Sequence, residues 1–167
     1  MVALLLLGGP AQLRVQAQRG DPTPRESATL FKQADQVVIY TNDSLSVARH
    51  RIAVALQANG FVVDTVLATL VQTQITVLPR TFGVAKPARS EAFAYLRTRG
   101  AGPLIILEGF CLADADIIPR RKVKMKDSVY QGAQRGCQKA AFRQLEAVAR
   151  AYPGGRLSYR AGMSRND

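Results

Sequence analysis

The densest group of chemically active side chains in this 167-residue chain is basic. The seven positions from 120 to 126 hold five cations: Arg120, Arg121, Lys122, Lys124 and Lys126. Such a run can hold the phosphates of nucleic acid or of lipid headgroups by charge alone. If the run is extended, its lysines alternate with Val123 and Met125, a pattern that also protects an exposed sheet edge against aggregation. The run therefore predicts either an anion-binding surface or a solvated, protective segment.

The other titratable side chains offer one candidate for a catalytic or cation site, the pair Asp114 and Asp116. His50 is the only histidine, and the pattern places it on the outer side of a helix. A general acid–base pair requires two carboxylates that folding brings together. The candidate carboxylates are Asp64, Glu91, Glu108, Asp114, Asp116 and Asp127. Asp114 and Asp116 alternate at the end of a strand and share a face, which would suit an acid–base pair, a cation or simple solvation.

The turn Thr41-Asn42-Asp43-Ser44 precedes an apolar helical stripe. Its short oxygen-bearing side chains can accept hydrogen bonds from the free N–H groups of a starting helix. A helix N-terminus can also bind phosphate. Neither GxGxxG nor GxxxxGK[ST] is present, however, so the sequence favours ordinary helix capping.

Two cysteines, Cys111 and Cys137, make up the whole thiol inventory. In an exported protein a single pair predicts one disulfide, here from the end of a strand to the start of the last helix. In a cytosolic protein the pair would be two buried thiols that behave as small hydrophobes. Neither lies in a CxxC or a metal-ligand spacing, so redox catalysis and zinc binding are disfavoured.

The first seventeen residues favour export. Val2 to Leu7 is apolar, Gly8-Gly9-Pro10 breaks a helix, and Val15-Gln16-Ala17 offers small residues where a signal peptidase reads. Two features depart from this pattern, because no basic residue precedes the apolar run and Arg14 is close to the cut. The alternative is a frayed tail or an edge strand. The apolar run is too short to span a bilayer as a helix.

The chain carries a formal net charge of +11, while 47% of its residues are hydrophobic. The apolar fraction is that of an ordinary globular protein with a real core. The charge favours anionic partners, namely nucleic acid, acidic lipid or lipopolysaccharide, or acidic polymers, and does not choose among them. Simple solubility is the alternative explanation of the charge.

A β-α-β unit opens the folded region. An apolar strand at 36–40 is followed by a helix with Leu45, Ala48, Ile52, Ala55 and Leu56 on one face, which ends at Asn59-Gly60. Two strands are expected at about 61–67 and 71–78, a hairpin at 91–97 and 104–108, a second helix at 137–152 and an optional edge strand at 156–160. Gly109 suggests a bulge or bend in the hairpin. Residues 26–34 suggest a short helical lead-in.

The element order β-α-β-β-β-β-α predicts an α+β fold, a two-layer sandwich of a mainly antiparallel sheet with two helices on one face. A Rossmann-like parallel sheet is the alternative, and the hairpin counts against it. We expect a signal peptide at 1–17, a linker and lead-in at 18–34, a single α+β domain at 35–160 and a frayed tail at 161–167.

Several segments resemble those of a loose group of small uncharacterised bacterial envelope proteins, often lipoproteins. They are Asn59-Gly60-Phe61, Gln72-Thr73-Gln74-Ile75-Thr76, the 97–107 hairpin, and the closing helix from Gly136-Cys137-Gln138 through Ala149. The resemblance covers about residues 35–160 and implies an envelope location and a non-enzymatic role. It brings no catalytic residues. The chain departs from the lipoprotein pattern because no cysteine lies near the expected cut.

Three functions follow from the sequence. The leading hypothesis is an exported periplasmic or outer-envelope protein that binds or scaffolds an anionic or protein partner, without a cofactor, a metal or a membrane-spanning segment. The second is a cytosolic nucleic-acid-binding module that uses residues 120–126, whose affinity would fall steeply with salt. The third is an enzyme that uses Asp114 and Asp116.

Overall fold

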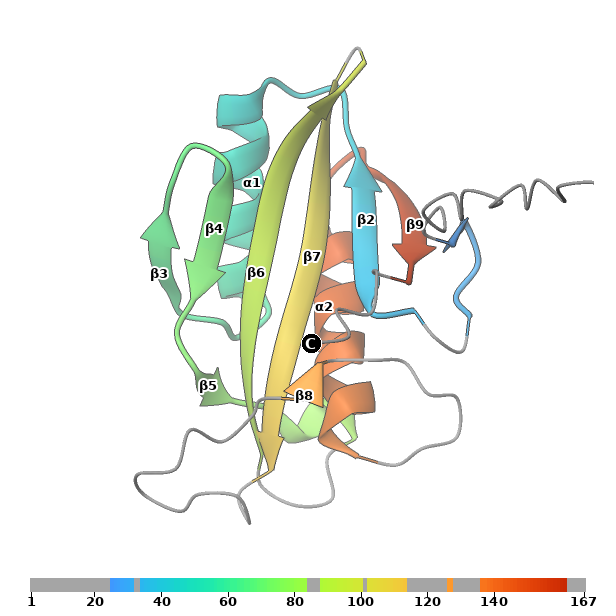
Figure 1. Ribbon diagram of the computed structural model, residues 1–167. Coiled ribbons are helices and arrows are strands. Elements are labelled where there is room, and N and C mark those ends of the chain that lie inside the picture. Colours follow the sequence, from blue (N-terminus) through green and yellow to red (C-terminus); the bar gives the residue numbers. More distant parts are fainter. Residues whose placement is uncertain are drawn as a thin grey trace, which may run out of the picture.

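The computed structural model describes residues 25–31, 34–83, 88–100, 102–113, 126–127 and 136–161 (Figure 1). Within these ranges lie two α-helices, α1 (Leu45–Ala58) and α2 (Cys137–Ala151), and a 3-10 turn at Arg80–Phe82. The strands are β1 (Glu26–Ser27), β2 (Gln36–Tyr40), β3 (Val63–Val66), β4 (Leu70–Thr73), β5 (Thr76–Val77), β6 (Ala88–Arg99), β7 (Gly102–Ala113), β8 (Lys126–Asp127) and β9 (Arg156–Arg160).

All these strands join one sheet, in the order β1-β9-β2-β7-β6-β4-β3, with β5 paired to β6 and β8 paired to β7. Every pairing is antiparallel. The sequence-based prediction of an α+β fold with a mainly antiparallel sheet is therefore confirmed, and a parallel Rossmann-like sheet is not what forms.

Both helices cover the same face of the sheet, and the strands pass in front of them in Figure 1. The main core lies between the two layers. It joins the apolar stripe of α1, including Ile52 and Leu56, to Phe142 and Leu145 of α2 and to alternate strand residues such as Ile105. Because side chains alternate across a strand, this face takes the odd-numbered residues of β2 and β7 and the even-numbered residues of β6.

The β6–β7 hairpin is the longest element and runs in unbroken register from Ala88↔Ala113 to Arg99↔Gly102. Its turn begins at Gly100, whose φ of 63° lies in the left-handed region that glycine adopts without strain. Gly102 lies against the backbone carbonyl of Thr41, where a Cβ atom would overlap the oxygen. The expected bulge or bend at Gly109 is wrong, since Gly109 simply pairs with Ala92.

Three other local expectations differ from the structure. The lead-in expected to be helical contributes a strand, because Glu26 and Ser27 pair with Arg160 and Tyr159 of β9. The strand expected at 71–78 is two short strands, β4 and β5, which pair with different parts of β6. The last strand, β9, is not at the edge but lies between β1 and β2. The β-α-β unit also spans the sheet, since three strands separate β2 from β3.

The second face of the sheet carries no described helix. A smaller apolar cluster of Val38, Leu104 and Ile106 lies there, with Tyr40 and Tyr95 packed against it. These side chains come from neighbouring strands, so the cluster forms by cross-strand contact.

Candidate functional site

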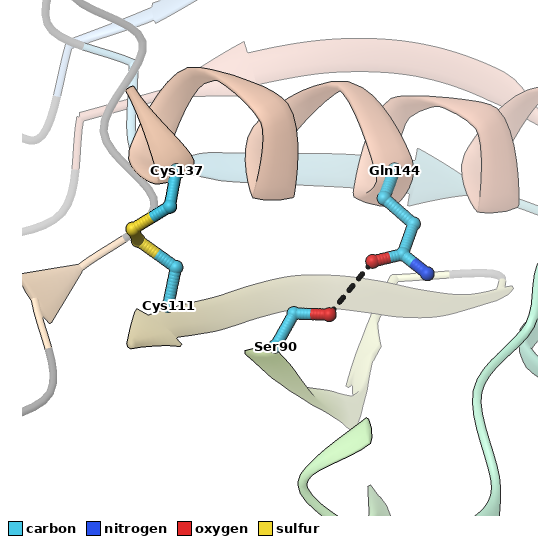
Figure 2. Close-up of a disulfide and its surroundings, with 4 residues drawn as sticks. All are labelled: Ser90, Cys111, Cys137 and Gln144. Carbon is cyan, nitrogen blue, oxygen red and sulfur yellow. Dashed lines mark hydrogen bonds between the residues drawn. A yellow bond between two sulfur atoms is a disulfide. The ribbon is translucent and has the colours of Figure 1, made fainter. Parts of the chain in front are cut away.

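A disulfide joins Cys111 and Cys137, the arrangement that the sequence predicted for an exported protein. Cys111 lies near the end of β7 and Cys137 is the first residue of α2, and their Cα atoms are 5.8 Å apart (Figure 2). Cys111 is buried, with 2% of its surface exposed. The bond therefore fastens the start of α2 to the sheet.

Hydrogen bonds of a buried side chain further along α2 also hold this helix against the sheet (Figure 2). The Gln144 side chain is fully buried, and its amide oxygen accepts a 2.8 Å hydrogen bond from the Ser90 hydroxyl of β6. Its amide nitrogen donates to the backbone carbonyl of Asn59, which follows α1, at 2.9 Å. Both polar groups of this buried side chain are thus satisfied, as burial requires.

The basic run is mostly outside the described residues, as are Asp114 and Asp116. Arg120, Arg121, Lys122 and Lys124 fall in that part, so the anionic-partner surface stays a prediction. Lys126 belongs to β8, where its backbone pairs with Cys111. The run lies in the segment between Cys111 and Cys137, whose two ends the disulfide holds together.

The turn at the start of α1 is a structural cap. The Ser44 hydroxyl accepts a 3.3 Å hydrogen bond from the Val47 backbone N–H, as the sequence predicted, and Thr41 accepts one from the Asp43 N–H at 3.1 Å. The Asp43 carboxylate lies beside this helix end and would repel a phosphate there. The turn therefore caps α1 and is not built as an anion site.

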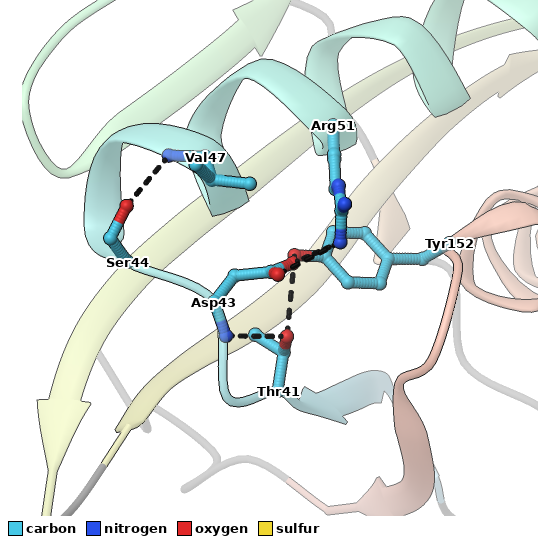
Figure 3. Close-up of polar contacts among 6 residues, drawn as sticks. All are labelled: Thr41, Asp43, Ser44, Val47, Arg51 and Tyr152. Atoms are coloured by element: carbon cyan, nitrogen blue, oxygen red, sulfur yellow. Dashed lines mark hydrogen bonds and ion pairs between the residues drawn. The ribbon is translucent and has the colours of Figure 1, made fainter.

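Asp43 also connects the turn to the end of α2 (Figure 3). It accepts hydrogen bonds from the Tyr152 hydroxyl at 2.5 Å and from the Arg51 guanidinium at 2.8 and 2.9 Å. The Tyr152 hydrogen bond is the main cause that lowers the pKa of Asp43. Burial, with the Asp43 hydrogen bond, raises the pKa of Tyr152 to about 12. Both groups therefore stay in their bonded states at neutral pH.

Glu26 has a similar role that sequence reasoning missed. Its carboxylate accepts hydrogen bonds from the Tyr40 hydroxyl, from the Ser158 hydroxyl at 2.5 Å and from Arg160 at 2.8 Å. Burial would raise the pKa of Glu26, but these three hydrogen bonds outweigh it and lower the pKa to about 2. The carboxylate thus fastens β1 to β9 and β2.

Three of the carboxylates proposed for acid–base chemistry accept hydrogen bonds from glutamine side chains. Glu91 accepts a hydrogen bond from Gln72 at 3.0 Å, Glu108 accepts one from Gln36, and Asp64 accepts one from Gln74. Within the described ranges no three His, Cys, Asp or Glu side chains lie close enough to hold a metal ion. His50 lies on the exposed side of α1, as the sequence predicted.

A hollow of about 540 Å³ opens where the start of α1, the β3–β4 turn and the upper part of β6 meet. Its lining residues are Leu45, Thr69, Tyr95, Leu96, Arg97 and Thr98. Sequence reasoning missed this feature, because three segments that are far apart in the chain form it. No pattern in the sequence marks it, since Arg97 is one of three arginines in β6.

The chain matches no model of a known protein family and no curated protein. In the described part of the chain, no helix is both long and apolar enough to cross a bilayer.

Proposed function

We propose that the chain is an exported protein of the bacterial envelope whose single α+β domain binds or scaffolds a partner and is not a catalyst. The observation that carries the proposal is the disulfide between Cys111 and Cys137. Structural disulfides form and persist in oxidising compartments and are rare in the cytosol. The apolar stretch before Ala17 supplies the matching export signal.

The polar groups support a binding role over a catalytic one. The two carboxylates with lowered pKa values, Glu26 and Asp43, are occupied by hydrogen bonds that tie strands and helices together. A catalytic carboxylate must instead lie within hydrogen-bonding reach of the substrate. These hydrogen bonds hold the strands and helices in fixed positions. Such a domain suits a rigid scaffold that binds a partner through its surface.

The basic segment is the proposed contact surface for an anionic or negatively charged protein partner. Arg120, Arg121, Lys122 and Lys124 lie in sequence between Cys111 and Cys137, the two residues that the disulfide joins. A nucleic-acid-binding function would use the same cations, but it requires a cytosolic chain with reduced thiols.

Cell fractionation with thiol labelling tests the proposal. Proteins of the native producer are acid-quenched, denatured and alkylated with a large maleimide, with and without prior reduction. We expect the chain in the periplasmic or membrane fraction, with both cysteines protected until dithiothreitol is added. Recovery in the cytosolic fraction with two reactive thiols would overturn the proposal and favour the nucleic-acid alternative.

A further inference from the structure

The hollow beside β6 has a free strand edge as one wall. β6 pairs with β7 along its whole length, but on its other side β4 reaches only as far as Tyr95. The last bond on that side runs from the Leu96 N–H to the Thr69 carbonyl, at 2.8 Å. The residues that precede Thr69 form the turn from β3 and do not pair with β6. In the described part of the chain, no strand therefore pairs with this side of β6 beyond Leu96.

The backbone of Thr98 points into this opening. In an antiparallel ladder the N–H and C=O of one residue point to the same side, and the side alternates from residue to residue. Because the Leu96 N–H points toward β4, those of Thr98 do as well, while Arg97 pairs with Leu104 of β7. The hollow therefore offers one donor and one acceptor to an added strand.

The charge of the hollow has a single sign. Arg97 is the only ionisable cation among the lining residues and no carboxylate is among them. The Arg97 side chain is exposed, and within the described residues it forms no ion pair. The remaining walls mix the apolar Leu45 and Leu96 with the hydroxyl groups of Thr69 and Thr98. Such a wall accepts an anionic group with a small apolar neighbour.

The direction of β4 decides which end of a peptide fits. An added strand that continues the line of β4 and runs antiparallel to β6 has its last residue against the β3–β4 turn at Leu67 to Thr69. A chain that continued past this point would meet the turn, so the occupant ends there. A strand of the opposite direction would place its positive N-terminus near Arg97, which charge disfavours.

We propose that the hollow binds the free C-terminus of an extended polypeptide, which adds to the edge of β6 at Thr98 and places its terminal carboxylate on Arg97. Main-chain hydrogen bonds to the strand edge provide alignment, and the guanidinium selects the carboxylate. This inference rests on the proposed binding function and names its partner class, but it does not depend on export.

The test uses purified, oxidised protein and an array of acetylated heptapeptides in which the last two positions sample all amino acids. Each peptide is made as a free acid and as a C-terminal amide, with amidated peptides that carry an internal Glu as a third set. We expect a subset of free acids to bind, with the amides at least tenfold weaker. This factor is the loss of one charge-assisted hydrogen bond. Equal binding of the amidated Glu peptides would show that a side-chain carboxylate is taken instead, which overturns the terminus.

Two variants and one control connect binding to the hollow. Arg97→Gln is expected to remove the preference for the acid over the amide. Thr98→Pro removes the outward N–H and the Thr98 hydroxyl but no hydrogen bond to β7, and is expected to weaken acid and amide alike. Arg89→Gln is the matched control, since Arg89 is an exposed cation on the same strand and the same face but far from the hollow.

The results separate the hollow from the wider proposal. The inference would be overturned if no free acid binds. It would also be overturned if Arg97→Gln and Arg89→Gln change the binding equally. Circular dichroism of each variant establishes that the fold is retained. Neither negative result affects the thiol-labelling experiment, so a failure of the hollow remains distinguishable from a failure of the exported binding domain.

Discussion

Removal of the Cys111–Cys137 disulfide should lower the stability of the domain by an amount that follows from the chain length it closes. The two cysteines are 26 residues apart in the sequence. In the chain-entropy account, a crosslink over such a loop restricts the unfolded state and is worth about 3.5 kcal/mol at 25 °C. With a urea dependence of about 2 kcal/mol per molar, the midpoint of unfolding should fall by roughly 1.7 M.

Urea unfolding followed by circular dichroism, with and without dithiothreitol, measures this difference. The double variant Cys111→Ala/Cys137→Ala should unfold near the reduced wild type and should not respond to the reductant. This control separates the loss of the crosslink from other effects of the reductant. The reasoning is refuted if reduction leaves the wild-type midpoint unchanged, or if the double variant unfolds with the oxidised protein.

Three further predictions concern single residues whose contacts hold the helices, turns and strands together. Gln144→Ala should cost about 3 kcal/mol of unfolding free energy, because it leaves the buried Ser90 hydroxyl unpaired and opens a cavity. Gly102→Ala should cost about 1–3 kcal/mol, because its Cβ atom would overlap the Thr41 carbonyl oxygen. Glu26 has a folded pKa of about 2 against 4.5 when unperturbed. Its contribution, about 1 kcal/mol after solvent screening, should be complete above pH 4.5 and disappear as the pH falls toward 2.

Urea midpoints check all three predictions, the last by comparison of the wild type with Glu26→Gln across the pH range. Arg143→Ala, at an exposed position one residue from Gln144, and Gly136→Ala, where a Cβ atom would meet nothing within 4 Å, serve as matched controls. A buried-site variant no weaker than its control would contradict the packing argument. A difference between wild type and Glu26→Gln that grows in acid would contradict the sign of the pKa shift.

The sequence predicted the parts of the fold that local patterns determine. The stripe from Ala141 to Tyr152 produced α2, and Gly100 between two β-prone runs produced the β6–β7 hairpin. With only two cysteines present, the sequence left one possible pairing, although it did not determine whether the bond forms. The order of the strands could not be predicted, because which strands become neighbours depends on contacts between distant segments.

The hydrogen bonds between distant polar side chains could not be predicted from the sequence for the same reason. Glu26 bonds to Ser158 and Arg160, which are 132 and 134 residues away, and the pattern of residues 26–34 suggested a helical lead-in and not a strand. Strands β4 and β5 pair with different parts of β6. The Val- and Thr-rich sequence shows no break between them, so it predicted one strand. The hollow at Arg97 likewise exists only after α1, the β3–β4 turn and β6 have come together.

The most direct test of the central claim, an exported domain closed by a disulfide, is the intact mass of the protein recovered from its native producer. We predict a chain that begins at Gln18 and is two hydrogens lighter than the reduced form, which reports cleavage after Ala17 and the Cys111–Cys137 bond in one spectrum. A chain that retains residues 1–17 and carries both thiols reduced would contradict the account.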